Sequence, residues 1–253
     1  MVPGFNPQDL AARYDVESFS EDEWHAYTGT RTAKIVEAYL ASCQAVPRCL
    51  LNAGAGVYQL NISGWKETAV DLFEAPICRH ENHVRASVEA LPLPSDAFGA
   101  VVCVGEVLGY CNPSKALSEF ARVLVPAGLL ICDFGSTRSS RHWLKREHGR
   151  AADLIIDEYK GTPEPIWRYD PQYIISLLAS FRFDLKDTIG THAWSAVARR
   201  IGVSPRSATY IQRHLEWLPF PDAWADLTTI VAVRLGARAA PPGKSSLSFP
   251  CLR

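Results

Sequence analysis

The sequence predicts an α/β fold, a doubly wound and largely parallel sheet with helices on both faces. Short apolar runs that fit buried strands alternate with segments of helical periodicity through the middle of the chain. The first of these runs, 49–53, breaks into Gly54-Ala55-Gly56, and the second, 66–72, carries Asp71 near its end. A glycine turn after one strand and an acid at the end of the next are typical of nucleotide-binding sheets.

The composition indicates one large globular domain that is soluble. The chain has 253 residues, 47% of them hydrophobic, and a formal charge of −1, which argues against a nucleic-acid-binding surface. Seven cysteines, several of them inside apolar runs, predict buried thiols in a reducing compartment. No run of about 20 apolar residues predicts a membrane span, and residues 1–10 do not resemble a leader, so we expect a cytoplasmic protein.

The glycine turn and the following acid predict a cofactor pocket. Gly54 and Gly56 allow close approach of a ligand to the backbone, and we expect a helix to start after them. The alternative is an ordinary left-handed turn. Asp71 lies nineteen residues after Asn52, where a carboxylate can accept both hydroxyls of a ribose. Its alternative is a solvated acid at a strand end.

The rest of the sheet follows from the same patterns, with little room for a full helix at 74–77. Asn112-Pro113 and Asp170-Pro171 each supply an N-cap and a proline in the first turn of a helix. The remaining strands are predicted at 83–87, 98–104, 129–134, 181–189 and 228–235.

The flanking segments are organised around this domain, which spans 46–235. Residues 1–45 form an N-terminal helical segment with a helix over 30–44; its aromatics either close a lid over the strand ends or pack in the core. Residues 236–253 read as a flexible tail. Insertions at 135–169 and 191–218 are predicted substrate caps. The basic and aromatic residues of the first insertion fit either an acidic or aromatic metabolite or a solvated helix face.

Several ordered blocks resemble the motifs of class I S-adenosylmethionine-dependent methyltransferases. The resemblance covers about 45–135, and its most specific block is Glu119-Phe120-Ala121-Arg122-Val123-Leu124-Val125-Pro126-Ala127-Gly128. It implies a Rossmann-like sheet whose final strand is antiparallel, and S-adenosyl-L-methionine as cofactor. The other blocks are 50–56, Asp71, 89–94, 100–103 and 106–108.

The resemblance also implies a set of cofactor-binding residues, with the glycines under the methionine part, the acid on the ribose, and the remainder around the adenine and the methyl group. These residues are Tyr14, Asn52, Gly54, Gly56, Asp71, Leu72, Ser87, Val88 and Gly105. The chain departs from the family pattern at four positions. Asn52 and Ser87 stand where acids are common, Tyr58 replaces a third glycine, and Gly99 replaces an aspartate.

Methyl transfer from a sulfonium depends mainly on alignment, and a general base helps when the nucleophile carries a proton. The candidate catalytic residues are Glu106, His25 and His192; for each, the alternative is a loop or solvated side chain. The candidate substrate-binding residues are Trp24, Tyr27, Tyr110, Trp143 and Trp167. No metal site is expected.

We therefore expect a methyltransferase acting on a small molecule, with secondary metabolism as one setting. Two alternatives remain open: an S-adenosylmethionine-binding enzyme that catalyses a cyclisation or rearrangement, and a degenerate, non-catalytic partner subunit. The acceptor atom is undetermined, and a homodimer is left open.

Overall fold

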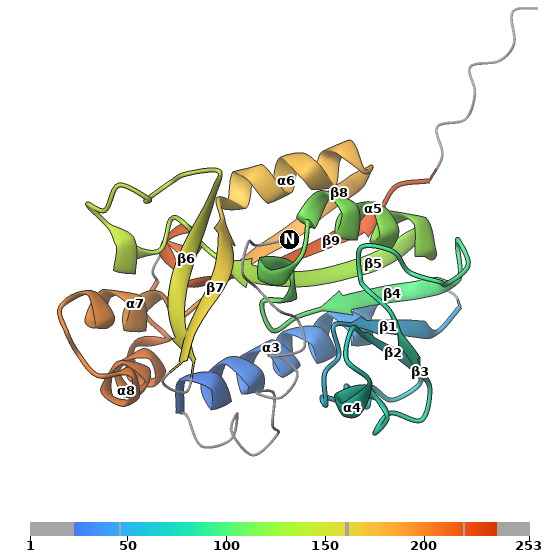
Figure 1. Cartoon of the computed structure of the whole chain (residues 1–253), viewed down its shortest axis with the longest axis horizontal. Coiled ribbons are helices and arrows are strands. Elements are labelled where there is room, and N and C mark those ends of the chain that lie inside the picture. Colours follow the sequence, from blue (N-terminus) through green and yellow to red (C-terminus); the bar gives the residue numbers. More distant parts are fainter. Residues whose placement is uncertain (1–22, 46, 160–161, 220, 237–253) are drawn as a thin grey trace, which may run out of the picture.

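The computed structural model describes residues 23–45, 47–159, 162–219 and 221–236. In this part of the chain the main sheet has seven strands in the order β3-β2-β1-β4-β5-β9-β8 (Figure 1). β9 runs antiparallel to both of its neighbours and the other pairs are parallel, which confirms the predicted fold class. The strands of this sheet are β1 (Cys49–Ala53), β2 (Lys66–Asp71), β3 (His83–Arg85), β4 (Phe98–Cys103), β5 (Leu124–Gly135), β8 (Phe183–Thr191) and β9 (Leu227–Arg234).

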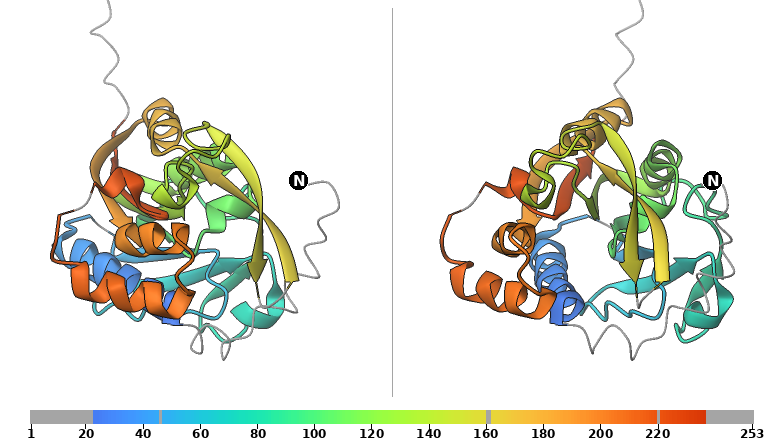
Figure 2. Two further views of the ribbon diagram at one scale, coloured as in Figure 1. Left: turned by 90° about the vertical axis from the view of Figure 1, so that its left-hand side faces the viewer. Right: turned by 60° about the vertical axis from the view of Figure 1, so that its left-hand side comes forward.

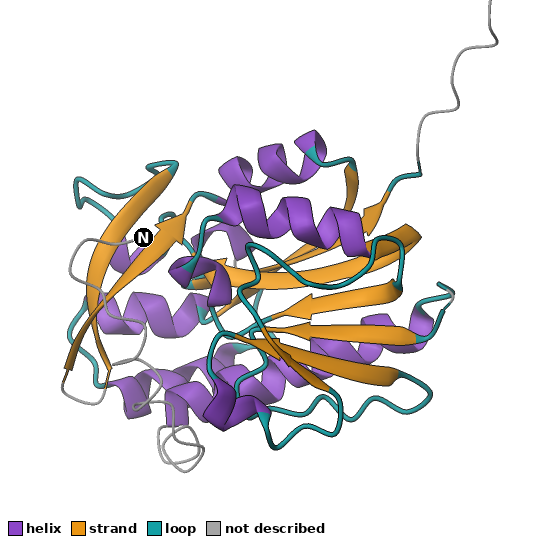
Figure 3. Cartoon of the chain, turned by 45° about the vertical axis from the view of Figure 1, so that its right-hand side comes forward, coloured by secondary structure: helices purple, strands orange, loops and turns teal. Residues whose placement is uncertain are grey.

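Helices cover both faces of the sheet (Figure 3). On one face, the main core cluster includes Phe120 of α5 (Pro113–Val123) and Leu178 of α6 (Pro171–Ser180). On the other face, Val36 and Leu40 of α3 (Glu23–Ser42) pack against strands β1, β4, β5 and β9. The two-sided burial explains why β4 is apolar at every position.

The predicted starts of α5 and α6 are confirmed by their caps. Asn112 Oδ1 accepts hydrogen bonds from the backbone N–H of Ser114 at 3.0 Å and of Lys115 at 3.3 Å. Asp170 Oδ1 accepts the N–H of Gln172 at 2.8 Å. Each cap satisfies backbone donors that the first helical turn leaves unpaired, and a proline follows it directly.

Helix α3 is the described part of the N-terminal segment, and only its packing in the core can be compared with the prediction. It begins at Glu23, seven residues before the expected start, and its C-terminal half packs in the core. Its N-terminal half extends past the sheet and lies beside α8 (Pro205–Leu215), which follows α7 (Ala193–Arg200) (Figure 2). Residues 1–22, with Tyr14, and most of the predicted tail lie outside the described residues.

The helix expected after the glycine turn is absent: residues 57–65 form turns and irregular backbone, and no helix is assigned between β1 and β2. Asn61 and Gly64 have positive φ angles of 48° and 77°, which a continuous helix does not allow. The segment packs through Leu60 and Trp65 against the core on the α3 side of the sheet. No helix N-terminus therefore faces the ligand side of β1.

The first insertion folds as a β-hairpin that the sequence analysis did not predict. Strands β6 (Ala152–Tyr159) and β7 (Thr162–Tyr169) form a separate two-stranded antiparallel sheet. The hairpin lies beside the C-terminal ends of β4 and β5 (Figure 1). Its sequence signal is two runs separated by the two residues Lys160-Gly161, but Pro163 and Pro165 weaken the second run as a strand.

Candidate functional site

The turn after β1 lies close to the turn after β4. Gly54 has φ 74°, and its N–H donates to the Val70 carbonyl of β2 at 2.7 Å. A Cβ at Gly54 would come within 2.5 Å of the Val107 side chain, so only glycine lets the two turns approach this closely. A Cβ at Gly56 or Gly105 would meet nothing within 4 Å, so both glycines face open space.

Asp71 ends β2 beside this open space. Its Oδ2 accepts the Gly56 N–H at 2.8 Å and its Oδ1 accepts the Phe73 N–H at 3.0 Å. An ionised carboxylate has about four acceptor sites, so two remain for the hydroxyls of a ribose. Leu72 is 44% exposed beside it, whereas Val88 is buried and Ser87 accepts the Glu89 N–H at 3.2 Å. Open space, a free acceptor pair and an exposed apolar side chain fit a nucleoside.

The Asn52 side chain is buried and has a structural role. It is 3% exposed, and its Nδ2 donates at 2.8 Å both to the Tyr58 carbonyl and to Glu67 Oε1. Glu67 Oε2 accepts the Leu60 N–H at 3.0 Å, and His80 Nε2 lies 3.1 Å from the Gly56 carbonyl. These bonds hold the glycine turn in place. They do so in the absence of the helix that was expected to follow the turn and order it.

The other departures from the family pattern also have local reasons. A Cβ at Gly99 would collide with the carbonyl oxygen of Pro47, so no aspartate fits at the start of β4. The Tyr58 side chain is 51% exposed, and its backbone carbonyl takes part in the bond from Asn52.

We expect replacement of Asp71 by alanine to weaken S-adenosylhomocysteine binding by about 10- to 100-fold, because two charge-assisted acceptors and the anchor of the glycine turn are lost. Isothermal titration of the variant checks this. Glu74→Ala is the control, since Glu74 is an exposed acid three residues away that pairs with Arg85. Unchanged affinity in the Asp71 variant would remove Asp71 from the site.

Glu106 stands on a strained turn at the end of β4. Gly105 and Glu106 both have positive φ angles, 88° and 60°, and Asp133 Oδ1 of β5 accepts the Glu106 N–H at 2.8 Å. A Cβ at Gly135 would lie 2.6 Å from Glu106 Oε1, so glycine at that position makes room for the carboxylate. Strained, over-determined backbone of this kind concentrates at functional sites.

Burial raises the pKa of Glu106 to about 7, and Arg168 opposes this rise. Asp133, fully buried, has its pKa raised to about 6 by burial. A carboxylate with a pKa near 7 is suited to accept a proton at neutral pH. In the described part of the chain, no donor forms a hydrogen bond with the Glu106 carboxylate.

Arg168 joins Glu106 to a network of buried charges. It is 4% exposed, and its guanidinium donates to Asp226 at 2.8 Å and to Asp157 at 3.4 Å. Arg168 and Arg141 hold the pKa of Asp226 far below its usual range. The sequence analysis missed Arg168, Asp133 and Asp226, although an aspartate inside the apolar run of β5 was a signal.

The structure brings three predicted residues together where α3 meets His192, the residue that precedes α7. His192 is 1% exposed and stacks on Trp24 with 3.7 Å between ring centroids, and Tyr27 meets its edge. Thr28 Oγ1 lies 2.7 Å from its Nε2 and Ser195 Oγ lies 2.9 Å from its Nδ1. Hydrogen-bonded on both nitrogens, this ring has the setting of a packing histidine.

The remaining candidates are dispersed. His25 lies half-buried on α3, and Tyr110 ends the short 3-10 helix η1 (Val107–Tyr110). Trp143 packs edge-on against Trp224 with 4.7 Å between ring centroids. Trp167 lies on the opposite face of β7 from Arg168 and packs against the main core.

Two further short 3-10 helices are η2 (Ser140–His142) and η3 (Asp222–Trp224).

The described residues contain no group of three side chains placed to hold a metal ion. None of their helices is both long enough and apolar enough to cross a bilayer.

Comparisons with known proteins agree on this fold. Residues 51–132 match the family model described as "Methyltransferase domain". The 1,6-didemethyltoxoflavin-N1-methyltransferase of Burkholderia thailandensis, solved with 1,6-didemethyltoxoflavin and S-adenosylhomocysteine, is 18% identical and covers 93% of both chains with a TM-score of 0.55. The glycopeptide N-methyltransferase MtfA, complexed with S-adenosyl-L-methionine, is 14% identical over 80% of this chain and 93% of that one, with a TM-score of 0.52.

A third similar structure is the [4+2]-cyclase SpnF, 15% identical over 79% of this chain and 80% of that one, with a TM-score of 0.52. No curated protein matches the sequence significantly. Residues 51–132 therefore resemble a methyltransferase domain, and the chain shares the fold of the class I S-adenosylmethionine-dependent methyltransferases, enzymes whose cofactor is S-adenosylmethionine.

Proposed function

We propose that the protein transfers a methyl group from S-adenosylmethionine to a small-molecule acceptor, such as a secondary metabolite, and that Glu106 is its general base. The observation that carries this proposal is the Glu106 carboxylate, held on a left-handed turn between the glycine turn of β1 and the hairpin, with its pKa raised to about 7. Two methyltransferases of the same fold that act on a small molecule and a glycopeptide support the acceptor class.

In this proposal, one set of residues binds the cofactor and Glu106 acts on the acceptor. The bound cofactor supplies a methyl group on a sulfonium, which is a good leaving group. Gly54 and Gly56 leave room for it, and Asp71 offers acceptors to its ribose. Glu106 takes the proton of the acceptor, and holding the reactants in line supplies most of the acceleration.

A reaction without methyl transfer is the second candidate. It is favoured by Asn52, which replaces the usual acid and leaves the pocket without that charge, and by the likeness to the cyclase SpnF. The third reading, a non-catalytic partner subunit, predicts no cofactor binding at all.

Two measurements on the full chain test the proposal. Titration calorimetry with S-adenosylmethionine and S-adenosylhomocysteine should give micromolar dissociation constants for both; absence of binding at millimolar ligand would reject both enzyme readings. A screen of small phenols, acids and amines then follows the formation of S-adenosylhomocysteine. Product modified without loss of the cofactor's methyl group would favour the non-methyl reaction.

A further inference from the structure

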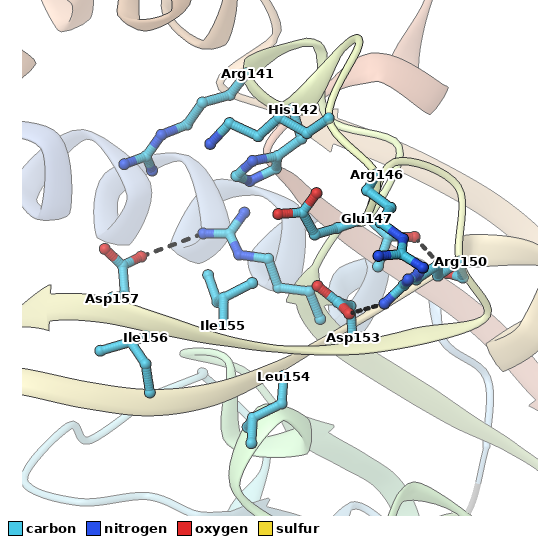
Figure 4. A pocket seen from close by; sticks show the side chains of 13 residues that line it. Arg141, His142, Arg146, Glu147, Arg150, Asp153, Leu154, Ile155, Ile156 and Asp157 are labelled. Atoms are coloured by element: carbon cyan, nitrogen blue, oxygen red, sulfur yellow. Dashed lines mark hydrogen bonds and ion pairs between the residues drawn. The ribbon is translucent and has the colours of Figure 1, made fainter.

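A cavity of about 550 Å³ lies between the segment 137–150 and the face of β6 and β7 that carries Arg168 (Figure 4). In Figure 4, Arg141 and His142 approach it from one side, and Ile155 and Asp157 from the strand on the other. The volume falls within the range of small-molecule sites. Five cationic side chains line it: Arg141, Lys145, Arg146, Arg150 and Arg168.

The acids around the cavity do not balance these cations. Its lining contains three, Glu147, Asp153 and Asp157. Asp153 is paired with Arg150 at 3.1 Å, and Asp157 with Arg168 at 3.4 Å.

The unpaired cations come from the segment 137–150. Among the described side chains, Lys145 and Arg146 form no ion pair, and only Glu147 offsets them. Arg141 shares Asp226 with Arg168, at a longer distance of 3.8 Å. The cavity therefore keeps a net positive charge.

His142 adds a polar group without a partner. Its Nε2 is buried and forms no hydrogen bond within the described part of the chain. Burial and the nearby charge of Arg168 lower the pKa of this ring to about 4, so it is neutral near pH 7. An unpaired buried polar atom is costly, and a ligand that hydrogen-bonds to it would remove that cost.

We propose that this cavity binds the anionic group, a carboxylate or a phosphate, of the methyl acceptor. Lys145 and Arg146 supply the counter-charge, Arg141 and His142 contact the bound anion, and Arg168, which faces both the cavity and Glu106, places the acceptor next to the base. Guanidinium groups suit both anions because of their planar, bidentate geometry. The assignment of the acceptor as an organic anion rests on the proposed function.

The test uses three probes of matched size on the full chain saturated with S-adenosylhomocysteine: benzoate, phenyl phosphate and the neutral benzamide. We expect titration to show at least tenfold tighter binding of one anion than of benzamide, weakening at high salt. Benzoate and phenyl phosphate separate a carboxylate site from a phosphate site. The double variant Lys145→Ala/Arg146→Ala should lose about tenfold in anion affinity and keep its affinity for S-adenosylhomocysteine.

The control is Lys66→Ala/Lys186→Ala, which removes the same charge from exposed positions on β2 and β8. Equal binding of benzamide and the anions, or an equal loss in both double variants, would overturn the anion site while leaving the methyltransferase proposal intact. If S-adenosylhomocysteine itself does not bind, the proposed function fails, and the same titrations without it still decide whether the cavity takes anions.

Discussion

Replacing Glu106 by glutamine is expected to lower kcat by about 10²- to 10⁴-fold, the usual contribution of a general base. The amide keeps the size of the side chain beside Gly135, so the S-adenosylhomocysteine affinity should change by less than about twofold. Steady-state kinetics with an acceptor from the screen and titration calorimetry measure the two quantities. A fully active Glu106→Gln enzyme would end the candidacy of Glu106 as a base.

The pH profile gives an independent readout of the same residue. A base must be deprotonated, so kcat of the native enzyme should rise with pH and level off above about pH 7, where Glu106 is ionised. The glutamine variant should lack this rise. Glu74→Gln, at an exposed acid on α4 (Glu74–Ile77), is the control and should keep both the rate and the profile.

Replacing Arg168 by methionine is expected to lower the free energy of unfolding by about 3–5 kcal/mol, because it leaves the buried Asp226 with only the more distant Arg141 as a cationic partner. The Asp226 side chain is 8% exposed, and Arg168 is its nearest cation at 2.8 Å. Urea unfolding followed by circular dichroism measures the loss. The pKa of Asp226 is depressed in the native protein, so its stabilisation is present above about pH 4 and disappears as pH falls further. The deficit of the variant should therefore shrink in acid.

Arg150→Met is the matched control for that loss. Arg150 pairs with Asp153 at 3.1 Å, but its side chain is 48% exposed, so removal should cost no more than about 1 kcal/mol. A second variant, Arg168→Met/Asp226→Leu, should recover part of the stability because the buried carboxylate is removed together with its nearest cation. Equal losses of unfolding free energy in Arg168→Met and Arg150→Met would show that the buried pair contributes no more to stability than the exposed pair.

The sequence by itself predicted the strands of the main sheet and the glycine turn and acid at their ends. The strand before Gly54, the acid Asp71 and the proline caps of α5 and α6 depend on residues close together in the chain, and apolar periodicity and turn chemistry report such local structure. The same local reasoning failed after Gly56, where the expected helix is replaced by turns held by Asn52 and Glu67, whose partnership spans two strands.

Only the tertiary structure decided which side chains surround Glu106. Asp133, Arg168 and Asp226 come from β5, β7 and the residue before β9, and no sequence spacing links them. They meet because β9 runs antiparallel to β5, so that Leu227 pairs with Gly135 and the start of one strand lies at the end of the other. The β6–β7 hairpin then places Arg168 beside these strand ends. The same arrangement buries Glu106, and this burial raises the pKa of its carboxyl group.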